Sequence, residues 1–140
     1  MYFLTAPISW SPNPGQPYSK VDVPKGFVTD FASIPRPFWS LFPPDGEYAY
    51  AAIIHDYLYW SQARPRAEAD EILKFAMKDL GVSALALATI YGAVWAAGGF
   101  AWSRNAELKQ QGERRFLKEL PIEATTRWED WKKKPGVFDD

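Results

Sequence analysis

The feature of this sequence that most restricts its fold is a long run without charge. No Asp, Glu, Lys or Arg occurs from Leu80 to Ser103, which is 24 residues. A helix of that length can cross a bilayer. The run is only weakly hydrophobic, however, because seven of its residues are alanine and four are glycine, including Gly98 and Gly99. We therefore expect a buried central helix from Ser83 to about Ala97, ended or kinked at the two glycines, with a membrane span as the alternative.

The residues before this run predict short strands, turns and two further helices. Residues 21–23 and 27–29 flank a Pro-Lys-Gly turn, which indicates an antiparallel pair. Two prolines bracket Arg36, so residues 30–37 are expected to form a rigid loop, followed by one helical turn over residues 38–42. Apolar residues at helical spacing predict helices over residues 47–61 and 66–80. The expected core positions of the latter are Ala69, Ile72, Leu73, Ala76 and Leu80.

The remaining chain predicts one more helix and a tail. Residues 107–120 are typical of a charged amphipathic helix, which Pro121 ends. Gly81 is expected to close the helix over residues 66–80. The fold class is therefore α+β: short N-terminal antiparallel strands and a rigid loop packed on three to four helices. We expect a single compact domain over residues 1–122 and an aromatic, charged tail over residues 123–140. The expected partner-binding anchors are Trp39, Trp128 and Trp131.

Composition removes several classes of protein. The chain has 140 residues, no cysteine and a single histidine, His55. A disulfide scaffold, a thiolate zinc finger, a cysteine nucleophile and an HExxH zinc protease are thereby excluded. The formal net charge is −1, which argues against a nucleic-acid partner, because phosphate binding normally requires a basic excess. Residues 1–7 carry no positive charge and only a short apolar run, so we expect no signal peptide.

Four polar residues embedded in apolar sequence are the candidate functional site. They are Asp30, His55, Asp56 and Asp70. Burying such groups is costly unless they are paired, so each of them needs a partner. If the helices that carry His55 and Asp70 form a hairpin, the two side chains can approach each other, and Asp30 on the rigid loop can cover the same point. The sequence therefore predicts one shared polar cluster.

The chemistry of this cluster has three interpretations. The first is a hydrolytic site in which Asp30, His55 and Asp70 bind a divalent metal (Zn, Mn or Mg), and Asp56 serves as a further catalytic residue or ligand. The second is a purely structural buried cluster. The third uses Ser33 as a nucleophile with His55 and an aspartate, although no G-x-S-x-G turn surrounds that serine. The expected supporting residues are Thr29, Ser33, Arg36, Tyr59 and Arg66.

Three ordered motifs in this region resemble a phage-associated family of uncharacterised domains. They lie at Gly26–Arg36 (G-F-V-T-D-F-A-S-I-P-R), His55–Tyr59 (H-D-Y-L-Y) and Arg66–Asp70 (R-A-E-A-D). The resemblance covers about residues 20–100. It implies a protein encoded in bacteriophage or prophage genomes, in the late region near tail and lysis genes, and it implies no known reaction.

Three functions follow as hypotheses. The first is a tail-associated virion or assembly component that binds other phage proteins and is found in the virion, or in the host cytoplasm before assembly. The second is a metal-dependent hydrolase acting on the host cell envelope, for instance on peptidoglycan. The third, which rests on the uncharged run, is a small membrane-associated lysis accessory.

Overall fold

The computed structural model describes residues 1–41 and 48–139. Its strands form two small antiparallel sheets rather than one. β1 (Tyr2–Phe3) pairs with β4 (Val28–Thr29), and β2 (Ile8–Trp10) pairs with β3 (Val21–Val23). The predicted pairing of residues 21–23 with 27–29 is wrong. After β3 the chain turns at Gly26, whose φ of +88° and hydrogen bond to the Leu4 carbonyl direct it toward the N-terminal strand instead.

Two helices follow a short 3-10 helix, η1 (Arg36–Leu41), largely as the sequence predicts. α1 is Tyr48–Ser61 and α2 is Arg66–Asp79. Residues 42 and 47, where the predicted helical turn ended and the first predicted helix began, lie outside the described residues. Gly81 closes α2 with φ +76°, the left-handed conformation that favours glycine at this position. The structure has the α+β class that the sequence predicts.

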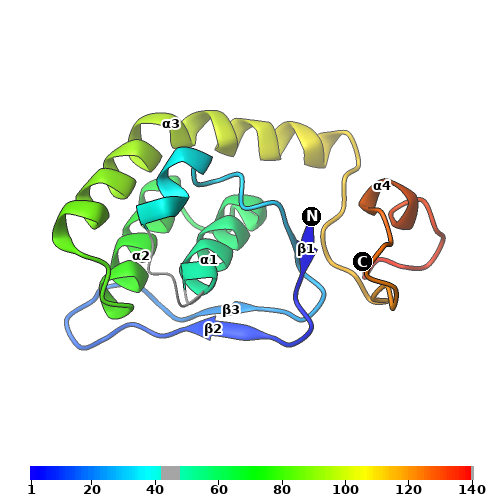
Figure 1. Cartoon of the computed structure of the whole chain (residues 1–140), viewed down its shortest axis with the longest axis horizontal. Helices are drawn as coiled ribbons and strands as arrows, with labels where there is room; N and C mark the ends of the chain where they lie inside the picture. The colour runs from blue at the N-terminus through cyan, green and yellow to red at the C-terminus, as the bar shows by residue number, and fades with distance from the viewer. Residues whose placement is uncertain (42–47, 140) are drawn as a thin grey trace.

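α3 differs most from expectation. It runs over Ala84–Gln110, through Gly98 and Gly99, so the predicted end at these glycines is wrong and the separate helix over residues 107–120 does not form, although α3 is visibly bent along its length (Figure 1). Ser83 caps its start by accepting a hydrogen bond from the Ala86 amide. The helix ends at Gln110, with Gln111 as its C-terminal cap residue, and Gly112 follows with φ +89°. Residues 107–110, which include the charged Glu107 and Lys109, are therefore the last turn of one long helix.

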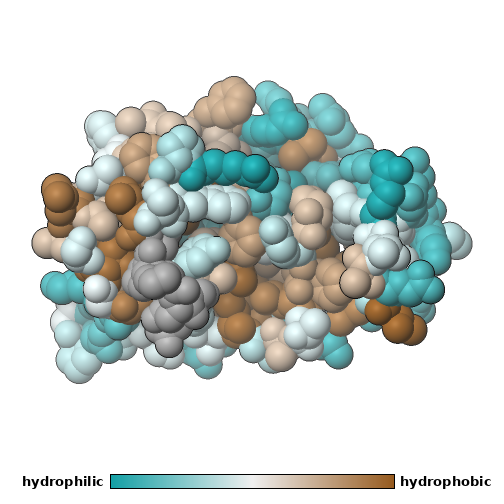
Figure 2. All heavy atoms as spheres, in the orientation of Figure 1, coloured by the Kyte–Doolittle hydropathy of each residue, from teal (hydrophilic) through white to brown (hydrophobic). Residues whose placement is uncertain are grey.

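α3 is also not the buried central helix that we expected. All of its residues are described, and those that are buried are Ile90, Val94 and Gly98. Leu85, Trp95 and Phe100 are 80%, 64% and 79% exposed. Figure 1 shows α3 along one side of the molecule, and Figure 2 shows apolar surface at the end where this helix begins. By length and composition alone, α3 could also cross a membrane.

The main core lies between α1, α2, α3 and the β2–β3 sheet, and α1 contributes most to it. The C-terminal segment forms a second, smaller cluster at the other end of the molecule (Figure 1). There Val137 packs with Val28 of β4 and with Leu117, and α4 (Trp128–Trp131) lies beside them. The amide of Asp139 donates to the carbonyl of Phe116, so this segment is held by backbone bonds as well as by apolar contacts.

Candidate functional site

The centre of the site is a histidine–aspartate pair that joins α1 to α2. His55 Nε2 lies 2.8 Å from Asp70 Oδ1, and both side chains are buried. The four-residue connection between the helices places the two residues face to face. Tyr59, one turn after His55, donates its hydroxyl to the same Asp70 oxygen at 2.6 Å. Burial raises the pKa of Tyr59, so that hydroxyl keeps its proton and remains a donor.

Ser33 completes the contacts of the imidazole. Its Oγ lies 3.0 Å from His55 Nδ1, so both ring nitrogens of His55 are hydrogen-bonded within the chain. Burial lowers the pKa of His55, and the bond to Asp70 only partly offsets that effect. The ring is therefore neutral near pH 7, with one nitrogen protonated and the other accepting a hydrogen bond.

Asp56 points to different partners from its neighbour His55. Thr29 Oγ1 donates to Asp56 Oδ2 at 2.5 Å, and the same Thr29 oxygen accepts from the Phe31 amide at 3.1 Å. Burial raises the pKa of Asp56 to about 6, and the nearby charge of Asp30 adds to this effect. Asp56 therefore changes its charge within the physiological range while still buried.

Asp30 is not a hydrogen-bond partner of the histidine, whose partners are Ser33 and Asp70. One of its carboxylate oxygens accepts a hydrogen bond from the Ala32 amide at 2.9 Å, and the other lies 3.6 Å from Arg115 Nη2. Arg115 is buried and stacks over the Trp60 ring at 4.5 Å. Sequence reasoning missed Arg115, because it lies in a charged stretch that resembled the solvated face of a helix.

The predicted metal site is not formed. In the part of the chain that the structure describes, no three His, Cys, Asp or Glu side chains are placed to hold a metal ion together. The physical reason is twofold: both nitrogens of His55 are already engaged, and Asp30 pairs with Arg115 instead of joining His55 and Asp70. The four polar residues therefore do not form one ligand set, although Asp30 and Asp56 line the same cleft as Ser33, which contacts His55.

The supporting residues divide between the cluster and the surface. Arg66 Nη1 lies 3.6 Å from Asp70 Oδ2, as part of the cluster. Arg36 does not reach the carboxylates, because its guanidinium lies over the Trp39 ring at 5.5 Å on exposed η1.

The Trp39 indole donates to the Ile34 carbonyl and the Trp131 indole to the Glu119 carbonyl. Trp128 packs edge-on against Phe138. These three tryptophans are thus all partly buried against their own chain.

A cleft of about 250 Å³ reaches the cluster from one side. One wall comes from the loop after β4 and from α1, and the other from the second half of α3. All four side chains are buried, but Ser33 and Asp56 are among the residues that line this cleft, whereas His55 and Asp70 are not. A larger hollow of about 530 Å³ lies in the C-terminal segment and contains none of these residues. The residues that line the cleft are Asp30, Ala32, Ser33, Asp56, Phe100, Ala101, Arg104, Asn105 and Leu108.

The region of the chain that matches known proteins includes the polar cluster but only part of the cleft. Residues 4–94 match the model of a family described as "Protein of unknown function (DUF1353)". The "Uncharacterized protein y4jT" of Sinorhizobium fredii (strain NBRC 101917 / NGR234) is 35% identical over 91 residues, which is 64% of this chain and 27% of that protein. The chain therefore spans about a quarter of that relative's length. No solved structure matches the chain. The family match includes Ser33, His55 and Asp70 and ends within α3, before the residues that form the far wall of the cleft.

Proposed function

The chain belongs to the DUF1353 family, and on that premise we propose that it is a late protein of a bacteriophage or prophage, acting as a tail-associated component of the virion or of its assembly. The three sequence motifs support the phage context. One structural observation supports the assembly role: the outer side of α3 is apolar and uncovered. In this proposal the protein occupies the host cytoplasm before assembly and the particle afterwards.

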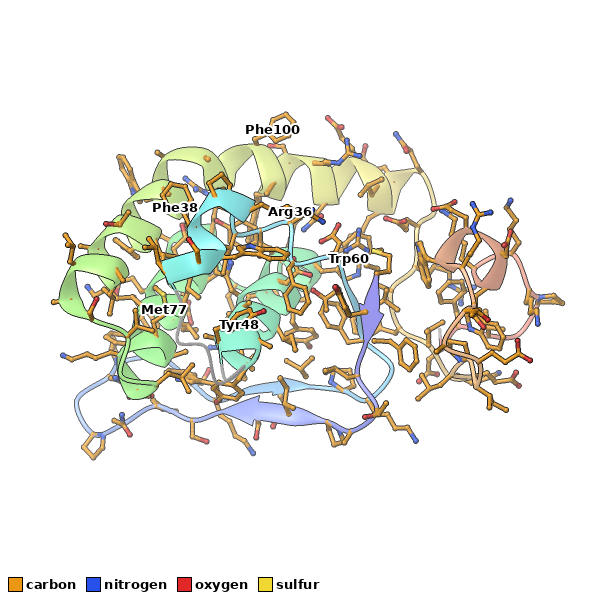
Figure 3. All side chains as sticks on the ribbon, in the orientation of Figure 1. Arg36, Phe38, Tyr48, Trp60, Met77 and Phe100 are labelled. Atoms are coloured by element: carbon orange, nitrogen blue, oxygen red, sulfur yellow. The ribbon has the colours of Figure 1, made fainter. Side chains whose placement is uncertain are left out.

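The outer side of α3 has the properties of a binding surface. Leu85, Trp95 and Phe100 are largely exposed, and Phe100 projects away from the body of the molecule in Figure 3. Soluble proteins seldom leave several large apolar residues uncovered on one element, because burying them against a partner is favourable. Exposed aromatic residues also supply much of the binding energy in protein interfaces. We refer to these three residues as the α3 face.

The chemistry of the α3 face favours a protein partner. It lies in the run without charged residues, so it offers no cation to the phosphates of a nucleic acid. The opposite side of the same helix packs on the core through Ile90 and Val94, so α3 cannot be surrounded by lipid while the fold is intact. A partner that presents an apolar surface, here another late protein of the same particle, fits both observations.

Photo-crosslinking tests this proposal. A benzoylphenylalanine at Phe100 should crosslink to a tail or other late protein during phage production, and the chain should be detected by mass spectrometry in purified particles or in assembly intermediates. The same group at the exposed Asp22, on β3, is the matched control and should give no such product. Absence from both particles and intermediates would contradict the proposal. The alternative of a metal-dependent envelope hydrolase finds no ligand set in the described residues and is not proposed.

A further inference from the structure

We infer that Ser33, His55 and Asp70 form a nucleophile–base–carboxylate relay, and that the chain hydrolyses short-chain carboxylic esters bound in the cleft beside Ser33. This activity does not depend on a binding partner, and Phe100 is the one residue of the α3 face that also lines the cleft. It rests on three features of the described residues: the geometry of the relay, the hydrogen-bond arrangement that fixes the imidazole, and the access of Ser33 to the cleft.

The relay has the distances that nucleophilic catalysis by serine requires. Ser33 Oγ is 3.0 Å from His55 Nδ1, and His55 Nε2 is 2.8 Å from Asp70 Oδ1. Such a chain is recognised by its geometry and roles rather than by the order of its residues. Here the loop after β4 supplies the serine, α1 the histidine and α2 the aspartate, so three separate elements hold one line of hydrogen bonds.

Surrounding groups set the direction of the proton transfer. The Tyr59 hydroxyl donates to Asp70 Oδ1, and the Arg66 guanidinium lies 3.6 Å from Asp70 Oδ2. Asp70 is thus arranged as an acceptor, which favours the tautomer with the proton on His55 Nε2. His55 Nδ1 is then unprotonated and can accept the hydroxyl proton of Ser33. Burial lowers the pKa of His55, so this neutral form is the resting one.

Asp56 is the second group beside the serine. Its carboxyl lies close enough to Ser33 to compete with His55 for the one hydroxyl proton. The pKa of Asp56 is raised to about 6, so near that pH some of the molecules carry a neutral Asp56 carboxyl. In those molecules His55 Nδ1 is the stronger acceptor for the Ser33 hydroxyl. Assays of the relay are therefore best made at pH 6 as well as at pH 7.

Ser33 is only 2% exposed, and the cleft that it helps to line is the route by which a substrate reaches it. The loop that carries the serine is sharply bent, since Phe31, two residues earlier, has φ +57°, an uncommon conformation for a bulky residue. Across the cleft, Phe100, Ala101 and Leu108 supply apolar surface for an acyl chain. Arg104 and Asn105 supply donors for the polar part of the ester. A volume of about 250 Å³ suits a small acyl group.

The reaction uses only the ester and water. Ser33 Oγ attacks the carbonyl carbon while its proton passes to His55 Nδ1, and a tetrahedral intermediate forms. The C–O bond to the alcohol then breaks, and the alcohol leaves with the proton from His55, which gives an acyl-Ser33 ester. Water attacks this ester in the same way, again through His55, and releases the carboxylic acid. No oxidant, metal or further reactant is consumed.

Labelling of the intact wild-type chain tests the proposal directly. A fluorophosphonate probe should modify one residue, and peptide mass spectrometry should place the label on Ser33. The wild-type protein should also hydrolyse p-nitrophenyl acetate or butyrate at pH 6 or 7. Ser33→Ala should lower that rate by about 1,000-fold or more, whereas Ser103→Ala, an exposed serine on α3, should leave it unchanged.

Asp70 is a positioning residue, so its test needs a readout other than rate. Asp70→Asn should lower the rate and move the acidic limb of the pH–rate profile to lower pH, because the carboxylate no longer favours the imidazolium. A label on any residue other than Ser33, or no labelling together with no hydrolysis by the wild-type chain, would overturn the proposal. Both of these results come from the wild-type protein, so they stand even if a variant fails to fold.

Discussion

A Cβ atom added to Gly98 would lie 2.2 Å from the hydroxyl oxygen of Tyr59 and 2.9 Å from Arg66 Nη1. Because that hydroxyl donates to Asp70, the missing side chain of Gly98 is what lets α3 pack directly over the polar cluster. The glycine that the sequence marked as a break in the helix is therefore a point of close contact between α3 and α1. This contact also places the second half of α3 where it forms a wall of the cleft.

Gly98→Ala should destabilise the protein even though alanine favours helix more than glycine does. The methyl group displaces the buried Tyr59 hydroxyl from Asp70, and we expect a net loss of roughly 1–3 kcal/mol in the free energy of unfolding. Gly99→Ala is the matched control: nothing lies within 4 Å of its added Cβ, so it should stabilise the protein by up to about 1 kcal/mol. Urea denaturation measures both values. Equal effects of the two variants would show that the close contact is unimportant.

The sequence predicted those elements that are set by local pattern. α1 and α2 follow from apolar residues at helical spacing, and the left-handed Gly81 follows from its place after α2. The meeting of His55 with Asp70 followed from the short connection between the two helices. These features depend on residues that are close together along the chain, which is why periodicity and turn chemistry reveal them.

Features set by distant contacts were not predictable. The pairing of β4 with β1 depends on the turn at Gly26 and on the N-terminal strand. The close approach of α3 to Tyr59 at Gly98 joins two helices that are far apart in the sequence. The pairing of Asp30 with Arg115 joins residues 85 positions apart and removes Asp30 from the expected metal site. No local pattern distinguishes a buried Arg115 from its solvated neighbours.

Gly26→Ala should be far more harmful than Gly15→Ala. Both glycines have φ +88°, so both substitutions carry the same cost of roughly 1–2 kcal/mol for a left-handed alanine. At Gly26 the new Cβ would also lie 2.0 Å from the Leu117 carbonyl oxygen, a backbone atom that cannot rotate away, whereas nothing lies within 4 Å at Gly15. We expect Gly26→Ala to cost about 2 kcal/mol more than Gly15→Ala in thermal or urea unfolding.

If the two variants unfold alike, the C-terminal segment does not pack on Gly26 in solution.

Limited proteolysis offers a second measurement of the same contact. Because Leu117 also donates its amide to the Gly26 carbonyl at 2.9 Å, Gly26→Ala should release the segment after residue 112 for cleavage before the rest of the chain unfolds. Gly15→Ala should leave the cleavage pattern unchanged.

Asp56→Asn should change how stability depends on pH. The pKa of Asp56 is raised from 3.8 to about 6 in the folded protein, chiefly by burial. Between these values the folded state binds a proton that the unfolded state releases, so this group lowers stability as the pH rises from 4 to 6. Asparagine does not titrate and can still accept the Thr29 hydroxyl. Relative to the wild type, Asp56→Asn should therefore gain roughly 3 kcal/mol between pH 4 and pH 7.

The difference between the two proteins is the quantity to measure. Urea denaturation at each pH gives the free energy of unfolding of the wild type and of the variant. Groups that both proteins share cancel in the difference between these two values. They include His55, whose lowered pKa makes stability rise with pH instead. A difference that stays constant with pH would mean that Asp56 titrates normally and is not desolvated in the folded state.

Substitutions on the two sides of α3 should separate binding from stability. Trp95→Ser and Phe100→Ser change exposed side chains of the α3 face, so the free energy of unfolding should shift by less than about 0.5 kcal/mol. Ile90→Ala, on the buried side of the same helix, should cost about 2–5 kcal/mol. If the α3 face binds another late protein, the two serine variants should lose incorporation into particles while remaining folded. If a variant that carries both Trp95→Ser and Phe100→Ser is incorporated into particles normally, the partner binds elsewhere on the molecule.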